Sequence, residues 1–216
     1  MAALTLAQLR LATEILVGDS SMTTYDISMY KDAINFSIKN YATKTGATYI
    51  ETDVTPDASG FCTIPTGYIR LQRVSYKVGG TTVTELTEST FSFESMKSSV
   101  WQAATATVPK RWVLWSGAKV KITPIPTVIY ASTIGYIENP VDLSVDGDIV
   151  DARIPIIHQE YLKYAAASWL LLLDGDGQNI GLADNLMEKF NSLIGYSDPV
   201  LELKLKQTRT KGDREV

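Results

Sequence analysis

The chain has 216 residues, of which 45% are hydrophobic and 20% are charged, and its formal net charge is −4. This composition excludes a disordered polar chain and a collagen-like repeat, and the length fits one large domain or two small ones. No apolar run nears the roughly 20 residues of a membrane-spanning helix, and the acidic balance argues against general binding of nucleic acid by charge. We therefore expect no membrane partner.

Two helices are predicted near the start of the chain. The first covers residues 4–17, because Thr5 and Gln8 fit a capping box and Gly18 fits a C-terminal stop. Its apolar side chains lie on more than one side, so we expect it to be packed against more than one neighbour. The second covers residues 27–44, before Gly46, and its apolar residues recur at steps of three and four: Ile27, Tyr30, Ile34, Ile38 and Tyr41.

Strand chemistry follows. Residues 47–137 are rich in Thr, Val, Ile, Tyr and Trp, with turn residues between the runs. We predict one hairpin through Gly79-Gly80 and another through Ser116-Gly117. Apolar positions change face after Leu71, which indicates a bulge. Residues 88–100 are ambiguous and could form one short helix, capped by Ser89 or Thr90.

Two further helices are predicted in the last third of the chain. One runs over residues 153–173, with one side made of Ile157, Tyr161, Ala165, Ser168 and Leu172. Gly175 is expected to end it. The other runs over residues 182–195, with these side chains in line: Leu182, Leu186, Phe190 and Leu193.

The segment 201–216 differs in kind. Its leucines alternate with charged residues, a pattern typical of a half-buried strand. It holds five basic and three acidic residues, whereas the rest of the chain holds 15 basic and 21 acidic residues. A basic extended end on an acidic body is typical of a segment that docks on another molecule.

These elements predict an α+β fold. Residues 1–46 and 150–199 would form the halves of a four-helix base, with two N-terminal and two C-terminal helices. Residues 47–149 would form an inserted antiparallel β-rich domain. Residues 200–216 would form an extended C-terminal arm.

The chain offers few residues for catalysis. One histidine, His158, cannot build a multi-histidine zinc site, and a Ser-His-acid triad could be made only through it. No nucleophile elbow, P-loop, dinucleotide fingerprint or H-E-x-x-H motif is present, so a structural role fits His158 better. The single cysteine, Cys62, has apolar neighbours, which predict a buried and inert thiol. We expect no enzyme activity and no cofactor.

Two acidic stretches could suggest a metal ion. Asp174 and Asp176 lie in a Gly-rich turn whose later positions lack the ligands of a calcium loop. Four aspartates between Asp142 and Asp151 fall in a turn-rich linker, for which a solvated loop is the expectation. We therefore predict no metal site.

Aromatic side chains of the β-rich region could stack sugars or bases, although most such residues belong to a core. They are Trp101, Trp112, Trp115 and Tyr130. Trp112 and Trp115 are three positions apart and face opposite sides of a regular strand. One of the two is therefore expected to be exposed or to lie at a subunit contact.

Four stretches, taken in order, point to a known family. They are residues 64–76 (IPTGYIRLQRVSY), 109–126 (PKRWVLWSGAKVKITPIP), 134–144 (IGYIENPVDLS) and 158–177 (HQEYLKYAAASWLLLLDGDG). With the order of helices, β-rich insert, helices and basic tail, the chain resembles the head–tail adaptor (connector or tail-tubular) proteins of tailed bacteriophages.

The resemblance implies a structural protein of the virion neck, assembled in the host cytoplasm. Such adaptors form a twelve-subunit ring under the portal protein, and the ring continues the DNA channel without binding DNA specifically. The ring also offers a surface to the next tail component. The arm that reaches into the portal corresponds here to a segment with these candidate contact residues: Leu201, Leu203, Lys204, Leu205, Lys206, Arg209, Lys211 and Arg214.

Two other functions remain open on the sequence. A glycan- or ligand-binding β module would use the tryptophans, and glycan-induced quenching of tryptophan fluorescence would favour it. A hydrolase would use His158, and loss of a measured hydrolytic activity in His158→Ala would favour it.

Overall fold

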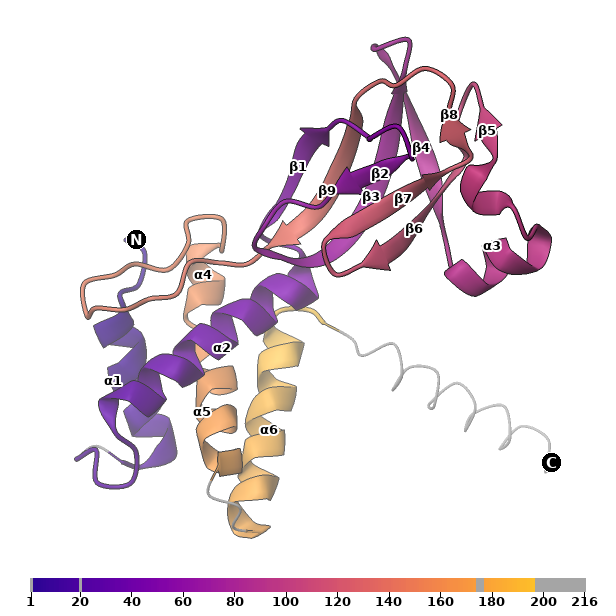
Figure 1. Cartoon of the computed structure of the whole chain (residues 1–216). Coiled ribbons are helices and arrows are strands. Elements are labelled where there is room, and N and C mark those ends of the chain that lie inside the picture. Colours follow the sequence, from indigo (N-terminus) through magenta and orange to yellow (C-terminus); the bar gives the residue numbers. More distant parts are fainter. Residues whose placement is uncertain (1, 20, 174–176, 197–216) are drawn as a thin grey trace, which may run out of the picture. The chain divides into compact units, whose positions relative to one another are not determined.

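Figure 1 shows a computed structural model of the chain, which describes residues 2–19, 21–173 and 177–196. The fold is mixed α+β and divides into two compact units. One, the helical unit, contains the described residues within 1–47 and 140–216. The other, the β unit, spans Thr48–Asn139 and contains a large curled sheet.

The helical unit begins with α1 (Leu6–Val17) and α2 (Ile27–Thr45), close to the predicted ranges. The predicted capping box of α1 is confirmed, because Thr5 N–H donates to Gln8 Oε1 at 2.9 Å and Gln8 N–H donates to Thr5 Oγ1 at 3.3 Å. Gly18 and Gly46 follow the two helices with φ angles of 74° and 71°. Glycine adopts this left-handed conformation without strain, which confirms both predicted stops.

Residues 153–173 do not form the single helix that was predicted. The chain makes α4 (Ile156–Gln159) and then α5 (Leu162–Leu173). The buried side chain of Gln159 accepts a hydrogen bond from Leu4 N–H at 2.8 Å and donates one to the Ile154 carbonyl at 2.9 Å. These bonds hold the end of α4 against the first residues of the chain. The turn between α4 and α5 is then formed by i→i−3 backbone hydrogen bonds.

The apolar side expected for this stretch is wrong at both ends. Ile157 is 60% exposed and Leu172 is 49% exposed. Between them, the predicted Ala165 and Ser168 are buried, and Ala166 and Leu170 join them on the buried side of α5. Small side chains allow close approach, and α5 contacts α1, α2 and α6 (Gly177–Leu193).

Helix α6 starts earlier than the predicted residue 182. Phe190, one of the four residues expected in line, is fully buried, whereas Leu182 and Leu193 are 44% and 38% exposed. Ala183 takes the inward position instead. The residues expected to end the preceding helix, including Gly175, lie outside the described residues.

One core joins α1, α2, α5 and α6. The predicted stripe of α2 faces it, except for Ile27, which is 55% exposed. On α1, Leu6 and Leu9 are buried, but Leu11 and Ile15 are exposed. The buried side chains of this core are Leu6, Leu9, Tyr25, Tyr30, Ala33, Ile34, Ile38, Tyr41, Leu143, Val150, Ile154, Leu162, Ala165, Ala166, Leu170 and Phe190.

The segment 140–149, assigned to the β-rich domain from the sequence, packs within the helical unit. Leu6 N–H donates to the Asp148 carbonyl at 2.9 Å. Asn35 of α2 accepts from Leu143 N–H at 2.8 Å and donates to the Leu143 carbonyl at 3.0 Å. These bonds satisfy buried polar groups on both sides of the contact.

Asp19 organises the connection between α1 and α2. Its carboxylate accepts hydrogen bonds from Tyr25 N–H at 2.9 Å, from Thr23 N–H at 2.8 Å and from the Tyr30 hydroxyl at 3.3 Å. The bond from the Tyr25 backbone is the largest cause that lowers the pKa of Asp19 to about 2. The charged form is therefore the one that the folded chain prefers.

This loop gives a prediction about pH. Because the folded pKa lies below the ordinary Asp value, the stabilisation is present above about pH 4 and is lost as the pH falls towards 2. We expect Asp19→Asn to lower the urea midpoint of helix unfolding at pH 7, with the difference shrinking steadily between pH 4 and pH 2. Circular dichroism at 222 nm measures both. A difference that does not change with pH would contradict this role of the charge.

The sheet of the β unit has the strand order β1-β9-β3-β4-β6-β7-β2. The strands are β1 (Tyr49–Val54), β2 (Phe61–Thr63), β3 (Tyr68–Val78), β4 (Thr82–Ser89), β6 (Arg111–Ser116), β7 (Lys119–Thr123) and β9 (Ser132–Glu138). A separate pair is formed by β5 (Thr105–Ala106) and β8 (Ile125–Pro126).

The two predicted hairpins are confirmed as the antiparallel pairs β3–β4 and β6–β7. The expected antiparallel order fails at two places, because β4 and β6 pair in parallel and so do β5 and β8. The chain between β4 and β6 runs through α3 (Phe91–Lys97) and the 3₁₀ turn η1 (Trp101–Ala103), a connection long enough to return to the same end of the sheet. The ambiguous region is thus a short helix, and Thr90 caps it by accepting from Phe93 N–H at 3.2 Å.

The bulge expected after Leu71 is confirmed. The pairing of β3 with β9 shifts register between Tyr68 and Arg70 and again between Leu71 and Arg73. β4 pairs with β3 only along Val74–Val78 and then joins β6. This departure of β4 opens a groove between β3 and β6.

Candidate functional site

His158 is hydrogen-bonded to a tyrosine of α2. Its Nδ1 and the Tyr41 hydroxyl lie 2.5 Å apart and share a hydrogen bond. Its ring also packs against Tyr161, with the ring centroids 5.6 Å apart. The ring nitrogen is thus engaged by a phenol of α2 and not by a serine or a carboxylate, which fits the structural role predicted for it.

Cys62 lies fully buried in the core of the β unit, as predicted. Burial raises the pKa of its thiol to about 12. A thiol with this pKa is protonated at neutral pH and is a poor nucleophile.

The aspartates between Asp142 and Asp151 are used in local structure. Asp142 pairs with Lys39 at 2.7 Å and Asp146 with Arg10 at 2.8 Å. Within residues 2–19, 21–173 and 177–196, no three Asp, Glu, His or Cys side chains are grouped so that they could hold a metal ion. Asp174 and Asp176, the other acidic pair considered, lie outside the described residues.

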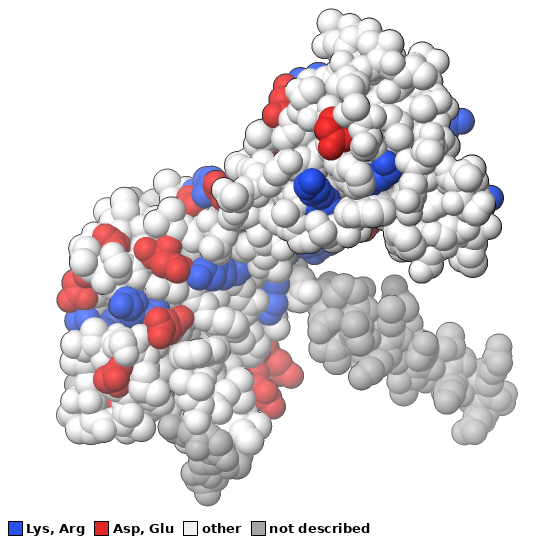
Figure 2. All heavy atoms as spheres, viewed as in Figure 1, with Lys and Arg blue, Asp and Glu red and all other residues white. Residues whose placement is uncertain are grey.

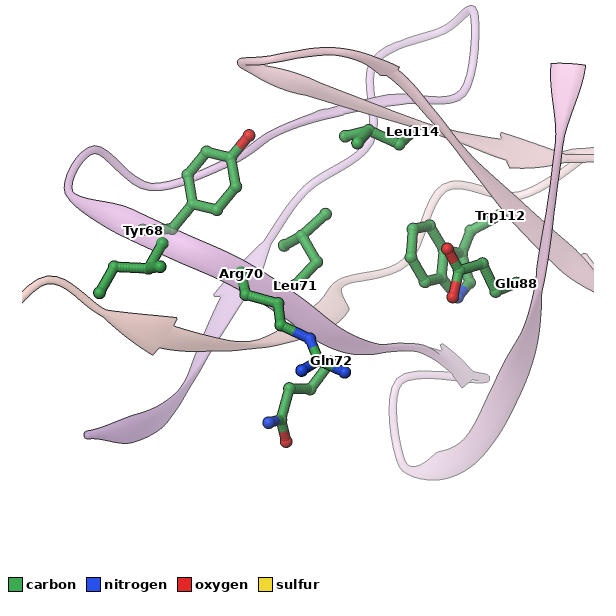
Figure 3. Close-up of a pocket in the computed structure, with 8 residues that line it drawn as sticks. Tyr68, Arg70, Leu71, Gln72, Glu88, Trp112 and Leu114 are labelled. Carbon is green, nitrogen blue, oxygen red and sulfur yellow. The ribbon is translucent and has the colours of Figure 1, made fainter. Parts of the chain in front are cut away.

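The groove between β3 and β6 has a volume of about 650 Å³. Figure 3 shows its lining, which comes from β3, β4 and β6: Tyr68, Arg70, Leu71, Gln72, Glu88, Trp112 and Leu114. The Tyr68 hydroxyl donates to the Gly117 carbonyl at 2.6 Å and links β3 to the β6–β7 turn. Trp112 is only 3% exposed, so its ring offers no open face on which a sugar could stack.

Trp115 belongs to a different feature, the aromatic cluster of Phe61, Phe91, Trp101 and Trp115. Ring centroids lie 5.3 Å apart for Phe61–Trp115, 5.6 Å for Phe91–Trp115 and 5.7 Å for Phe91–Trp101. Such edge-on and tilted contacts stabilise aromatic pairs. Trp101 is 4% exposed, whereas Phe91 is 51% and Trp115 40% exposed. The expectation that one of Trp112 and Trp115 is exposed is therefore confirmed.

Sequence reasoning missed two exposed phenylalanines at this cluster, Phe91 within it and Phe93 beside it on the same short helix. Phe91 and Phe93 follow the Thr90 cap on a short helix and both remain largely exposed. Two exposed aromatic residues on so short a helix were the signal that could have found the cluster.

Residues 1–209 match the family described as SU10 adaptor protein. The chain belongs to this family. The match confirms the resemblance to bacteriophage head–tail adaptors and supports a structural role in a virion. A search of curated proteins gives no match.

The charge of the adaptor is divided unevenly between its parts. The helical stretches 1–47 and 140–200 contain seven basic and 14 acidic residues, whereas residues 48–139 contain eight basic and seven acidic ones. On the face seen in Figure 2, acidic side chains gather in several places on the helical unit. The negative charge that the sequence assigned to the whole body thus lies in the helical unit, much of it in the connections between its helices.

The candidate portal-binding residues of the adaptor all fall in the segment 201–216, which lies outside the described residues. They are Leu201, Leu203, Lys204, Leu205, Lys206, Arg209, Lys211 and Arg214. In the part of the chain that the structure describes, no helix combines the length and apolar character needed to cross a bilayer.

Proposed function

We propose that this phage adaptor assembles as a ring, of twelve copies, between the portal protein and the next tail component, and that the ring continues the DNA channel. The observation that carries the proposal is the family match, which covers 209 of the 216 residues. The adaptor acts by assembly and needs no chemistry of its own, which fits a histidine bonded to a tyrosine and a cysteine buried in a core.

The charge distribution supports a passive conduit. A protein that grips DNA places lysine and arginine against phosphates. The stretches 1–47 and 140–200 have twice as many acidic as basic residues, so they repel phosphate. DNA can then pass without being held.

The segment 201–216 supports an arm that binds the portal. Leucines at alternate positions can add a strand to a partner or line a groove, and the intervening lysines can meet acidic side chains. Each exposed ion pair contributes only about 0–1 kcal/mol. The repetition of the contact around a ring would therefore supply most of the strength.

Three versions of the chain test the arm: the full chain, a chain that ends at Pro199, and a chain that ends at Gln207. The second lacks the whole arm, whereas the third keeps the leucines and loses three basic residues (Arg209, Lys211 and Arg214) and two acidic ones (Asp213 and Glu215). Binding to purified portal protein is measured by biolayer interferometry at low and high salt. We expect binding to fall about 100-fold or more without the arm, which corresponds to about 2.7 kcal/mol or more.

The version that ends at Gln207 should bind with intermediate strength and weaker salt dependence, because it has lost charges but no leucine. Thermal unfolding should be the same in all three, which shows that the body is intact. If the chain that ends at Pro199 binds the portal as well as the full chain, the arm is not the portal contact.

A further inference from the structure

Helix α3 exposes apolar side chains one after another. Phe91, Phe93 and Met96 are 51%, 43% and 79% exposed, Val100 just after the helix is 66% exposed, and Trp115, whose ring contacts Phe91, is 40% exposed. Single exposed apolar residues are ordinary on a protein surface, but a contiguous group marks an interaction site. Aromatic residues and methionine are enriched at the centres of such sites.

Buried polar contacts anchor α3 to the neighbouring elements of the β unit. Glu94, the inward residue of α3, is 1% exposed and pairs with Arg111 at 2.6 Å. Ser89 donates to the same carboxylate at 2.6 Å, and Trp101 Nε1 donates to Ser95 Oγ at 3.2 Å. The exposed side chains therefore stand on an anchored helix, and binding would cost little ordering of the backbone.

The surface is also cationic. Lys97 and Lys119 are exposed there, whereas Arg111 is paired with Glu94 and Lys121 is buried. Lys97 Nζ lies 4.2 Å from the centroid of the Phe93 ring, and Lys119 Nζ lies 5.8 Å from that of Phe61. Both lysines are exposed. Lys97 interacts electrostatically with Glu94 on the same helix, but neither lysine forms a close ion pair with a carboxylate among the described residues. The complementary partner is thus apolar and acidic.

Such a surface exists on the chain itself. Ile180, Asp184 and Glu188 follow each other at steps of four on α6 and are all exposed, which places them on one stripe of the helix. Neither carboxylate has a basic partner among the described residues, in contrast to Asp142 and Asp146. The stripe belongs to the unit that carries the negative charge of the chain.

We propose that the α3 surface of one copy (Phe91, Phe93, Met96, Lys97 and Trp115) docks on the α6 stripe of a neighbouring copy. The contact joins two different surfaces, and repetition of such a contact closes a ring when the rotation between copies divides a full turn. The proposal rests on the ring of the proposed function and assigns residues to its subunit contact. Apolar burial supplies its strength, and the lysine–carboxylate pairs set its register.

The test uses the full chain and sedimentation velocity over a range of concentrations. Met96→Asp and Lys97→Glu alter the α3 surface at exposed positions, and Val83→Asp, 53% exposed on β4, is the matched control. We expect the first two to raise the apparent dissociation constant of self-association by about tenfold or more and the control to leave it unchanged. Circular dichroism confirms that each variant is folded.

A charge exchange identifies the partner surface. Lys97→Glu combined with Glu188→Lys restores an opposite-charge pair at every contact of a head-to-tail ring, so self-association should return to within a few-fold of the native value. If the double variant associates no better than Lys97→Glu alone, α6 is not the partner. If Met96→Asp behaves as Val83→Asp does, the α3 surface is not a subunit contact.

Assembly on purified portal protein, followed by native mass spectrometry, separates this proposal from the proposed function. Complexes that form equally well with native chain and Met96→Asp would overturn the α3 contact and leave the adaptor function in place. Native chain that forms no complex with portal would overturn the adaptor function. Native chain that is monomeric both alone and on the portal would overturn the contact proposed here.

Discussion

Trp112→Ala is expected to lower the free energy of unfolding of the β unit by about 3–5 kcal/mol, the range for removal of a buried tryptophan or phenylalanine ring. Trp112 is 3% exposed and packs in one cluster with Val74, Leu86 and Ile122, residues of three neighbouring strands. It also forms a wall of the groove between β3 and β6, so its loss would join a core cavity to that groove. Urea unfolding followed by amide hydrogen exchange of the β unit measures the effect.

The matched control is Leu114→Ala, two residues further along β6 on the same face of the strand. Leu114 lines the same groove but is 50% exposed, so its truncation should cost about 1 kcal/mol or less. If the two variants lose the same free energy of unfolding, Trp112 is a surface residue of the groove. That result would revive a glycan-binding function.

Phe190→Ala is expected to lower the stability of the helical unit by about 3–5 kcal/mol. Phe190 is fully buried and is the large side chain through which α6 enters the core shared with α1, α2 and α5. Lys44 of α2 places its Nζ 5.6 Å from the centroid of this ring and donates to Asn191 at 2.6 Å. The substitution therefore removes both core volume and a cation–π contact between α2 and α6.

Leu193→Ala on the same helix is the control, because Leu193 is 38% exposed and should contribute about 1 kcal/mol or less. Helix content at 222 nm and hydrogen exchange of α2, α5 and α6 report the result. If both variants lose a similar amount of stability, contacts along the whole length of α6 stabilise its packing, and the Phe190 ring has no special part in it. The same assay shows whether α6 stays in place in variants of its exposed stripe.

Local features of the fold could be predicted from sequence because their causes are local. The capping box of Thr5 and Gln8, the glycine stops of α1 and α2 and the hairpin through Gly79-Gly80 each depend on residues within a few positions of one another. The stripe of α2 and the burial of Cys62 follow from apolar periodicity and from apolar neighbours. Family resemblance, confirmed over residues 1–209, also came from the order of such local patterns.

Features that depend on distant residues could not be predicted in this way. Gln159 divides a predicted helix because its amide bonds to Leu4, 155 positions away, and such a partner leaves no trace in local periodicity. The strands β1 and β2 flank one turn, yet they pair with β9 and β7 because closure of the curled sheet outweighs proximity in the chain. The aromatic cluster draws its four rings from separate elements for the same reason.

The sequence by itself determined the helices and hairpins, the absence of catalytic motifs, and the surplus of acidic over basic residues outside the last 16 positions. These properties depend on composition, spacing and short-range bonds. Only the tertiary structure decided that the negative charge belongs to the helical unit, that Trp112 is core while Trp115 is surface, and that α3 presents exposed apolar side chains beside an exposed lysine. Burial and the neighbourhood of charges are properties of residues brought together from distant parts of the chain, and folding alone creates them.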